Sequence, residues 1–464
     1  MKSPDGNLDY LFHPRSVALV GITTANPRHW TRSFLEGYLE FEFASRGALY
    51  LVNPKGGTVE GCHVYPSLKD IPDTVDFVIG LVPARVGPSL VEEAAGKGAR
   101  AVHFCTAGFS EIAEVEGARL QAEMLRVARD RNVRIIGPNC LGIYCPESRM
   151  SFSALFPRES GEVAFISQSG GNSNYLIREA ALRGIRFSKV ISIGNACDLN
   201  ESDFLEYLAS DPKTKTIAMY VEGVKDGGRF RRALEMAAKE KTLVLLKGGT
   251  TEAGTRAVMG HTASLAGSAA VWESLCRQIG IIQVQNLDSM VDVLVTLSLM
   301  ALPEGRRALL IGGGGGASVI VADEFERRRL KLPKLPQSVI KELREFSQAE
   351  GNFFSNPVDY SQSMEPEKMK KALQVMERWG GFDFFVNFTV PSQSVRTRDV
   401  AARPFEFGDI DKPAVIVIEP SIVPEDEARI FDFIKHYVSA RYPVYFSFAG
   451  AAAAIDLALA AKGI

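Results

Sequence analysis

One histidine, His261, stands among small and polar residues in the stretch GHTASLAG at residues 260–267. A neutral imidazole has a pKa of about 6.5, so it can act as a base, a ligand or a nucleophile near neutral pH. The flanking residues lack the periodicity that would bury the ring on a helix face, which predicts that His261 lies in an exposed loop. A lone histidine is more often structural, so its role depends on its neighbours.

A carboxylate, Glu222, directly follows an apolar run at residues 216–221 that predicts a strand. At a strand end, this side chain can accept the imidazole N–H, which fixes the tautomer and stabilises positive charge on the ring. A strand-end glutamate that faces water is the alternative interpretation.

A small-residue loop of Ser169, Gly170 and Gly171 joins a predicted strand at residues 163–167 to a helical stretch at 172–184. The first amides of a helix have no partner within the helix, and the macrodipole favours an anion there, so the loop is a candidate phosphate site. An ordinary Ser/Gly helix cap without a ligand explains the same residues. The loop, Glu222 and His261 gain weight together because all three are expected at the carboxyl edge of one parallel sheet.

Three sets of short apolar runs alternate with helical stretches and predict an α/β fold with three doubly wound parallel sheets. The runs are apolar throughout, as in parallel strands that are buried on both faces. The predicted strands are residues 17–20, 48–52, 75–82, 101–105 and 133–136 in the first set, 163–167, 188–193, 216–221, 243–247 and 281–284 in the second, and 308–311, 384–388, 414–418 and 444–446 in the third. Residues 145–161 are expected to connect the first two sets.

Two glycine-rich turns bear on nucleotide binding. The loop at Gly21 departs from GxGxxG because Pro27 and Arg28 occupy the later positions, which disfavours an NAD-dependent oxidoreductase. The run of glycines at residues 312–316 follows a predicted strand but lacks the GK[ST] of a P-loop, so Walker-type ATP binding is not expected. Close packing of a strand-to-helix turn explains that run equally well.

Composition narrows the class of protein. A chain of 464 residues has room for about three domains. Lys+Arg 53 against Asp+Glu 55 leaves a formal charge of -2 without a long basic run, so no nucleic-acid partner is expected.

The most apolar stretches are too short to span a membrane and are interrupted by Asp292 and Asp456. No secretory signal is readable, so a cytoplasmic protein is expected. The cysteines and histidines lack metal-ligand spacings, so no protein-built metal site is expected.

The assembled motifs resemble those of the nucleoside-diphosphate-forming acyl-CoA synthetases, which include the α subunits of ADP-forming acetyl-CoA synthetase and, more distantly, of succinyl-CoA synthetase. The matching segments cover nearly the whole chain in the family's order and read LFHPRSVALVG, VNPKGG, GPNCLG, ISQSGG, YVEGVKD, GHTASLAGS, GGGGGASV and NPVDY.

The resemblance implies a CoA-binding Rossmann domain at residues 1–147, a flavodoxin-like domain with a phosphorylatable histidine at 148–304, and a second flavodoxin-like ligase domain at 305–464. The family's ATP-grasp domains have no counterpart in this sequence. The resemblance therefore implies an α subunit that needs a separate ATP-grasp β subunit, in an α2β2 heterotetramer, with ADP or ATP and Mg²⁺ bound mainly on that partner.

The family's site residues are carried over onto matching positions. His261 matches the phosphohistidine, Glu222 matches the carboxylate that orients it, and Ser169, Gly170 and Gly171 match the phosphate-binding helix start. The CoA contacts fall on strand-end loops, at Gly21, Ile22, Thr23, Lys55, Val82, Pro83, Ala84, Cys105, Thr106, Ala107 and Asn139.

The activity that the resemblance implies is acyl-CoA + ADP + phosphate ⇌ carboxylic acid + ATP + CoA, through an acyl phosphate and a phosphohistidine. The chain departs from the family after Gly170, where Asn172, Asn174 and Tyr175 replace small residues. Amide and phenol groups there indicate a substrate that is larger or more polar than acetate. A CoA-binding regulatory protein that has lost catalysis is the alternative, against which the intact His261 and Glu222 argue.

Overall fold

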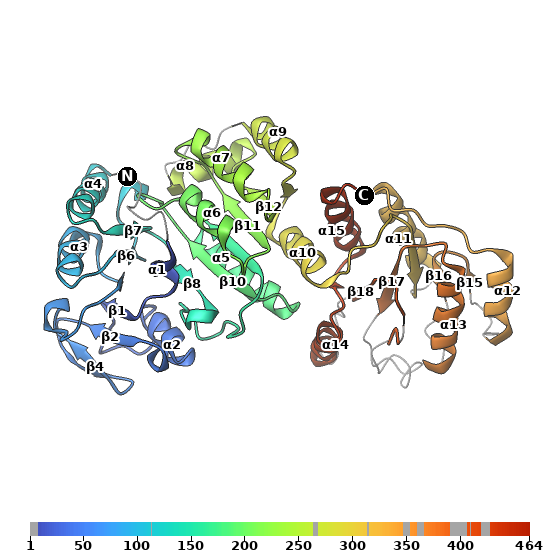
Figure 1. The fold of residues 1–464 in the computed structure, drawn as a ribbon, viewed down its shortest axis with the longest axis horizontal. Helices are drawn as coiled ribbons and strands as arrows, with labels where there is room; N and C mark the ends of the chain where they lie inside the picture. The colour runs from blue at the N-terminus through green and yellow to red at the C-terminus, as the bar shows by residue number, and fades with distance from the viewer. Residues whose placement is uncertain are drawn as a thin grey trace. The chain divides into compact units, whose positions relative to one another are not determined.

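A computed structural model of the chain describes residues 8–112, 114–262, 268–312, 315–346, 353–359, 366–389, 406–408, 410–418 and 427–464. The described residues form three mostly parallel sheets with helices between their strands, which confirms the α/β class and the doubly wound architecture (Figure 1). The chain divides into two compact units, residues 1–178 with 186–287 and residues 179–185 with 288–464. The first unit contains the first two sheets, and the second unit contains the third sheet.

The first sheet has the strand order of a Rossmann fold. In spatial order, its strands are β3 (Gly57–Val59), β4 (Cys62–Tyr65), β2 (Ala48–Val52), β1 (Ser16–Val20), β5 (Phe77–Gly80), β6 (Ala101–Phe104) and β7 (Arg134–Ile136). All pairs are parallel except the hairpin of β3 with β4. The order reverses beside β1, so the carboxyl ends of β1 and β5 border the crevice in which such sheets bind ligands.

The longer helices that cover the first sheet are amphipathic and bury one face against the strands. The helices of the first sheet are α1 (Asp9–Phe12), α2 (Arg32–Glu40), α3 (Gly87–Gly96) and α4 (Val115–Asp130), with short 3-10 turns between. Figure 1 shows α3 and α4 side by side on one flank of the sheet. Their buried residues, which include Leu90 and Met124, join the strand residues Val78 and Val102 in one core cluster.

The second sheet has the flavodoxin order, with one added antiparallel strand at its edge. In spatial order, its strands are β13 (Ile282–Val284), β12 (Thr242–Lys247), β11 (Thr216–Val221), β9 (Val163–Ser167), β10 (Phe187–Ser192) and β8 (Gly142–Tyr144). The reversal lies between β9 and β11, so the residues after these two strands, Gln168 and Glu222, are neighbours at the ligand-binding edge.

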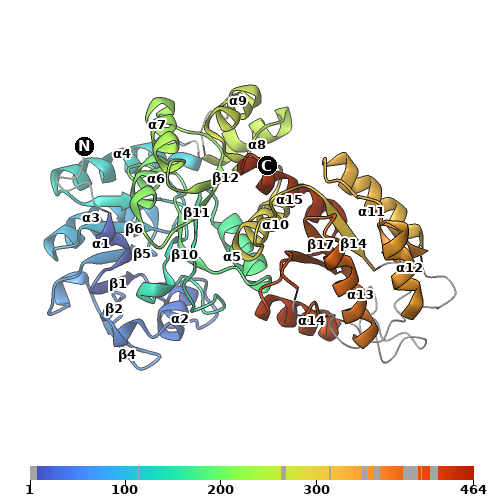
Figure 2. The same ribbon diagram turned by 45° about the vertical axis from the view of Figure 1, so that its right-hand side comes forward.

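The helices of the second sheet are α5 (Gly170–Leu182), α6 (Glu201–Ser210), α7 (Gly227–Ala237), α8 (Glu252–Thr262) and α9 (Ala269–Ile279). Two views show α6 and α7 side by side (Figures 1 and 2). The N-terminus of α6 is held by a capping box in which Asn200 accepts from the Ser202 amide at 2.9 Å and Asp203 accepts from the Asn200 amide at 3.0 Å.

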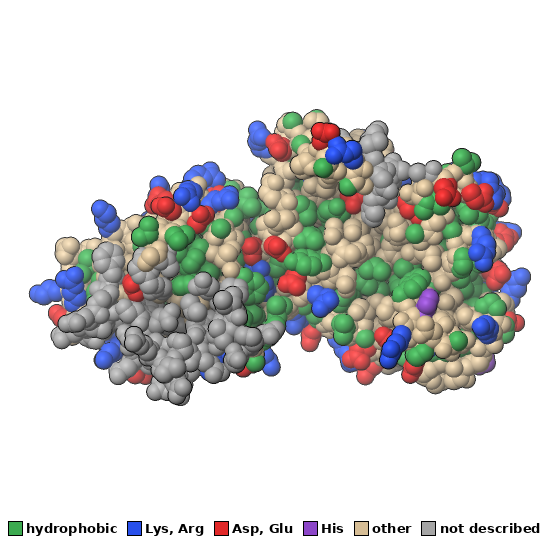
Figure 3. All heavy atoms as spheres, turned by 180° about the vertical axis from the view of Figure 1, so that it is seen from behind, with side chains coloured by type: hydrophobic (Ala, Val, Ile, Leu, Met, Phe, Trp, Pro, Cys, Tyr) green, Lys and Arg blue, Asp and Glu red, His purple; other side chains and the backbone are tan. Residues whose placement is uncertain are grey.

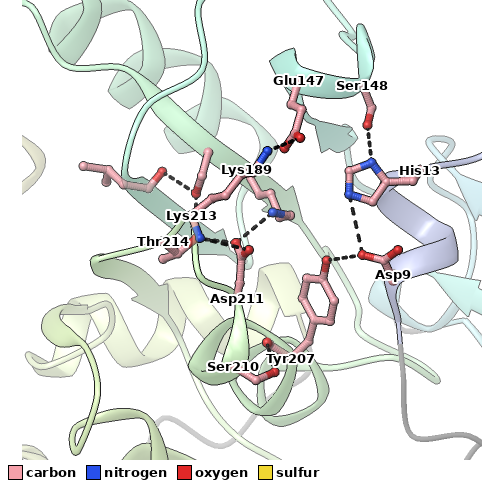
Figure 4. A network of polar contacts seen from close by, with 12 residues as sticks. Asp9, His13, Glu147, Ser148, Lys189, Tyr207, Ser210, Asp211, Lys213 and Thr214 are labelled. Carbon is pink, nitrogen blue, oxygen red and sulfur yellow. Dashed lines mark hydrogen bonds and ion pairs between the residues drawn. The ribbon is translucent and has the colours of Figure 1, made fainter. Parts of the chain in front are cut away.

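Polar contacts join the N-terminal helix to the elements of the second sheet (Figure 4). The imidazole of His13 shares a hydrogen bond of 2.6 Å with the Ser148 hydroxyl, and its other nitrogen lies 3.5 Å from Asp9. The Tyr207 hydroxyl of α6 donates to the Asp9 carboxylate at 3.1 Å. These contacts tie the first sheet to the second within the first unit.

The second unit contains the third sheet, which also has the flavodoxin order with an antiparallel edge strand. Its strands are β15 (Phe353–Phe354), β16 (Val358–Asp359), β14 (Ala308–Ile311), β17 (Phe384–Thr389), β18 (Ala414–Ile418) and β19 (Val444–Tyr445), in spatial order. Its helices are α10 (Leu287–Leu299), α11 (Gly315–Arg327), α12 (Gln337–Phe346), α13 (Pro366–Trp379), α14 (Glu427–Ser439) and α15 (Phe448–Ala461). The core on one face joins Leu309 and Ile311 of β14 to residues of α12, α13 and α14.

The glycine run after β14 gives a tight turn. Gly312 has a φ of 94°, and a Cβ there would lie 2.4 Å from the Phe388 carbonyl oxygen, so close packing requires glycine at this position. The following helix, α11, begins at Gly315, within the glycine run. Gly313 and Gly314 lie outside the described residues.

The described surface carries charges of both signs. Figure 3 shows acidic and basic side chains interspersed on the face it presents. None of the described helices is both long and apolar enough to cross a bilayer. No group of three or more potential metal ligands occurs within the described residues. All six cysteines are free thiols.

Candidate active site

A cavity of about 600 Å³ lies in the first unit, where the carboxyl ends of two strands of the first sheet meet the start of α5. We call it the α5 cavity. Cys105 and Asn139 line it from the first sheet, and Ser169, Gly170 and Gly171 line it from the second. Residues predicted separately to contact CoA and phosphate are therefore brought together in one space.

The start of α5 is shaped by small residues. The Ser169 hydroxyl accepts from the Asn172 amide at 3.3 Å, and the Ser167 hydroxyl donates to the Ser169 carbonyl at 2.8 Å, which ends the strand and begins the helix. A Cβ at Gly170 would lie 2.9 Å from the Leu141 side chain, whereas a Cβ at Gly171 would meet only the Ser169 hydroxyl, at 3.9 Å. The first-turn amides thus face an open space with room for an anion.

Gln168 fixes the two strand ends that border the reversal point of the second sheet. Its side-chain oxygen accepts from the amides of Glu222 at 2.6 Å and Gly223 at 3.2 Å, and its side-chain nitrogen donates to the Gly223 carbonyl at 2.7 Å. Gln168, Glu222 and Gly223 are all buried, so water does not replace these hydrogen bonds when the Gln168 side chain is lost. Gln168 therefore determines where Glu222 lies relative to the helix start.

Replacing Gln168 by Leu is expected to lower the free energy of unfolding by about 2–5 kcal/mol, because it leaves two buried amides without an acceptor. The same change at Gln283, half-buried on the edge strand β13, is expected to alter stability by less than about 0.5 kcal/mol. Urea denaturation of both variants measures the difference. Equal effects at the two positions would contradict the role assigned to Gln168.

Glu222 is buried, with 4% of its surface exposed, so the interpretation of a glutamate facing water is wrong. The Tyr220 hydroxyl donates to its carboxylate at 3.1 Å. Burial raises the pKa of Tyr220, the Glu222 charge raises it further, and a hydrogen bond with the Asn172 side chain opposes the shift. The phenol therefore stays protonated as a donor that orients the carboxylate.

Lys247, at the end of β12, contacts the backbone that follows β11. It was not predicted from the sequence as a site residue. Its amine donates to the carbonyls of Glu222 at 2.8 Å and of Gly248, and it lies 5.4 Å from the Trp272 ring centroid. Burial lowers the pKa of this amine from 10.5 to about 8, although the Glu222 charge acts in the opposite direction. A neutral amine retains two N–H donors, so both carbonyls stay paired after deprotonation.

The free energy of unfolding, relative to a Lys247→Met variant, is expected to rise between pH 8 and 10.5. In this window the unfolded chain protonates Lys247 and the folded chain does not, so the unfolded state binds more protons and stability increases with pH. Urea titrations of both proteins at several pH values measure this. If the difference in the free energy of unfolding between the two proteins falls or stays constant from pH 8 to 10.5, burial does not disfavour the charged form of Lys247.

His261 lies in the last turn of α8, so the prediction of a loop is wrong. The preceding residues favour the helix, since Ala and Met are good helix formers and Glu252 pairs with Arg256 at i,i+4 with a distance of 2.6 Å. The small residues at 263–267, which motivated the loop prediction, lie outside the described residues, as does the side chain of His261. Its role as phosphohistidine stays a prediction.

The predicted CoA contacts at β1 lie in a close-fitting turn. Gly21 has a φ of 100°, and a Cβ there would lie 2.5 Å from the Leu81 carbonyl oxygen. Ile22 is buried, and its carbonyl accepts from the Asn53 side chain at 2.8 Å. Thr23 lies at the rim, where its hydroxyl accepts from the Asn26 amide at 3.4 Å. The side chains of Thr31 and Asn53 thus hold the backbone of the turn, which lies at the carboxyl end of β1, where sheets of this order bind a nucleotide.

The other predicted CoA contacts follow β2, β5, β6 and β7 at the same edge. Lys55 is exposed, and its amide donates to the Asn53 side chain at 2.9 Å. The Thr106 hydroxyl donates to the Val82 carbonyl at 2.7 Å, and the Asn139 amide donates to the Thr106 carbonyl at 3.1 Å. The remaining predicted positions range from exposed to half-buried on the same loops and are Pro83, Ala84, Cys105 and Ala107.

The two cysteines of the α5 cavity are neutral thiols. Burial raises the pKa of Cys105 to about 12 and that of Cys140 well above its usual range. A nucleophilic cysteine needs a lowered pKa, so neither thiol is prepared for covalent catalysis at neutral pH.

The predicted acyl-site residues separate into two groups. Asn174 lines the α5 cavity, whereas Asn172 lies beside Tyr220 and Tyr175 is 40% exposed outside the lining. The cavity also contains residues that were not predicted, among them Arg178 of α5 and Phe152. Phe152 lies in the segment at residues 145–161, which joins β8 to β9 within the second sheet, so the prediction that this segment connects the first two sheets is wrong. Helical periodicity could have identified Arg178, since it follows Asn174 by one turn.

Comparisons with known proteins identify relatives of this chain. The CoA binding domain family matches residues 15–146, and the succinyl-CoA ligase like flavodoxin domain family matches residues 160–297. The chain is 35% identical over 383 residues to the α subunit of ADP-forming acetate–CoA ligase II from Pyrococcus furiosus, covering 82% of each chain. It is 35% identical to ADP-forming acetate–CoA ligase I of Archaeoglobus fulgidus over 83% of this chain and 55% of the relative, so it spans about half of that longer protein.

A solved structure extends the likeness across the whole fold. A dinucleotide-forming acetyl-coenzyme A synthetase 1 from Ca. Korarchaeum cryptofilum, in complex with phosphate and ADP, superposes with a TM-score of 0.80 at 28% identity, covering 99% of this chain and 97% of that one. The identity to the Pyrococcus α subunit and the coverage of both chains establish the relationship predicted from the motifs. The chain belongs to the nucleoside-diphosphate-forming acyl-CoA synthetase family.

Proposed function

We propose that this chain is the α subunit of an ADP-forming acyl-CoA synthetase, an enzyme that forms the carbon–sulfur bond of a thioester. The observation that supports this function best is the α5 cavity, where the strand ends of the CoA-binding sheet meet the start of α5. A thioester and a phosphate held at these two places would lie within one space, as acyl transfer between sulfur and phosphate requires.

The reaction has three balanced steps. A phosphate oxygen attacks the thioester carbonyl, the C–S bond breaks, and acyl phosphate and CoA form. A ring nitrogen of His261 attacks phosphorus, the P–O bond to the acyl group breaks, and the carboxylate leaves. A terminal oxygen of ADP attacks the phosphohistidine, the N–P bond breaks, and ATP forms. Each step is reversible, so the same residues serve thioester synthesis from ATP.

The chain's own groups supply positioning and charge. The first amides of α5, beside Ser169, Gly170 and Gly171, would hold the phosphate oxygens at a positive helix end. The Glu222 carboxylate would accept the N–H of His261 and stabilise the charge that develops on the ring. Phosphoryl transfer depends mainly on such positioning and electrostatic stabilisation, because its transition state is loose.

CoA would be held on the first sheet, with its phosphates beside Lys55 and Thr23 and its thiol end toward Cys105 and Asn139. ADP or ATP would bind on a separate ATP-grasp β subunit, where Mg²⁺ neutralises the nucleotide phosphates. The name "subunit alpha" of the Pyrococcus relative supports a partner subunit, and the phosphate and ADP in the Korarchaeum complex support the ligands. We further propose an α2β2 assembly and a cytoplasmic location, where CoA and ATP are available.

Co-expression with a candidate ATP-grasp subunit tests the proposal. With ATP, CoA and a panel of carboxylic acids, the complex is expected to release phosphate only when an acid and CoA are both present. Light scattering of the purified complex is expected to give the mass of two α and two β subunits. CoA binding without turnover for any acid would favour the alternative, a catalytically silent regulatory protein, which the buried Glu222 and the open helix start argue against.

A further inference from the structure

The α5 cavity continues from the helix start along one face of α5. Gly170, Asn174 and Arg178 line it and are spaced four residues apart, so they lie one above another on the same face. At a rise of 1.5 Å per residue, Arg178 follows Gly170 by about 12 Å along the helix axis. The space beside α5 therefore extends well beyond a bound phosphate and an acetyl group.

Part of the cavity lining is apolar. Leu141, Phe152 and Leu155 contribute to it, and the last two come from the segment that joins β8 to β9. The Leu155 amide donates to the Ser153 hydroxyl at 3.2 Å, which fixes the turn that presents this leucine. Leu155 is 79% exposed, so a ligand that covers it gains the hydrophobic free energy of its burial.

Arg178 supplies the only formal charge among the described residues that line the cavity. Its lining neighbours are neutral, because burial keeps Cys105 and Cys140 protonated and the others are Ser, Asn, Gln, Gly, Leu and Phe. None of the ion pairs formed within the described part of the chain includes Arg178. The cavity thus has two places that attract an anion, the start of α5 and the guanidinium.

We propose that Arg178 binds a distal carboxylate of the acyl group, so that the substrate is a dicarboxylic acid that is activated at one end. The inference rests on the proposed function and specifies its substrate class. The reacting carboxyl lies at the start of α5, the carbon chain packs against Leu141, Phe152 and Leu155, and the second carboxylate reaches Arg178. A guanidinium binds a carboxylate through two parallel hydrogen bonds, which makes arginine suited to this recognition.

Equilibrium binding of two acyl-CoA thioesters to the full-length chain tests the inference. Glutaryl-CoA and pentanoyl-CoA have acyl chains of the same length and differ in the terminal carboxylate or methyl group. Arg178→Met, which keeps the apolar stem and removes the charge, is expected to weaken glutaryl-CoA binding about 10- to 100-fold, since hydrogen bonds to charged groups have such an effect. Binding of pentanoyl-CoA is expected to change by less than about threefold, and Arg178→Lys is expected to restore part of the loss.

Arg232→Met, at an exposed arginine of α7 outside the cavity, is the matched control and is expected to change neither affinity. A CoA phosphate is the other anion that could pair with Arg178. In that case Arg178→Met would weaken glutaryl-CoA, pentanoyl-CoA and free CoA equally, and the inference would be wrong. Unchanged affinity for all three would overturn it as well.

Calorimetry separates this inference from the proposed function, because the binding measurement needs neither the partner subunit nor His261. A charge-dependent preference for glutaryl-CoA in a chain that never becomes phosphorylated would support the carboxylate site and contradict the ligase. Phosphorylation without any such preference would support the ligase and contradict the carboxylate site.

Discussion

Replacing Glu222 by Gln is expected to slow the formation of phosphohistidine about 10³- to 10⁴-fold, as the loss of an orienting carboxylate does in other imidazole-dependent sites. The amide is nearly isosteric, and Gln168 holds residue 222 through its backbone, so the fold is expected to remain. What changes is the charge beside the imidazole and the tautomer that it selects. Rapid-quench measurement of a single turnover with ATP and the partner subunit gives the rate.

Glu201→Gln is the matched control for this substitution. Glu201 is as buried as Glu222 and lies 3.5 Å from the Gln168 side-chain nitrogen, but burial already raises its pKa. Loss of its charge is expected to slow transfer by less than tenfold. A Glu222→Gln enzyme within tenfold of the wild-type rate, or equal losses at both positions, would show that Glu222 does not orient the reacting ring.

Gly21→Ala is expected to lower both stability and CoA affinity, the latter by more than about tenfold. At a φ of 100° a side chain costs about 1–2 kcal/mol, and its Cβ would lie 2.5 Å from a backbone oxygen of the neighbouring strand end. The oxygen of Leu81 cannot move without displacing the loop at Val82, so the turn at the CoA crevice must open. Thermal unfolding and calorimetric titration with CoA measure the two effects.

Gly57→Ala separates the backbone strain from the collision. Gly57 has a φ of 105°, and a Cβ there would meet no atom within 4 Å. We expect only the backbone cost of about 1–2 kcal/mol and nearly unchanged CoA affinity. If both alanines reduce stability and affinity alike, the close approach of Leu81 to Gly21 has no role in shaping the crevice.

The parallel strands were predictable because each is a continuous apolar run, which only burial on both faces explains. β9, β11, β14 and β18 begin and end where the sequence predicts. The hairpin of β3 and β4 and the edge strand β8 were not predicted. All three strands are short. β3 and β4 contain exposed or half-buried residues, which interrupts the apolar run, and β8 is buried but has only three residues.

The site was predictable where a residue follows a strand, and much less so where tertiary folding brings distant segments together. Ser169 and Glu222 could be predicted because they come just after a strand. Gln168 also comes just after a strand, but a glutamine there does not indicate any particular chemistry. Phe152 and Leu155 belong to a segment with no periodicity, so nothing local indicates that they face α5. Lys247 ends an apolar strand, and a charged residue there could have indicated a buried amine.

The central claim is that His261 carries the phosphoryl group between the α5 cavity and a nucleotide on another subunit. The direct measurement is to incubate the complex with ATP labelled at its terminal phosphate and to locate the label by peptide mapping. We expect an acid-labile, base-stable phosphate on His261, absent from a His261→Asn variant and discharged by a carboxylic acid with CoA. A label that survives acid, lies on another residue of this chain, or persists in His261→Asn would contradict the account.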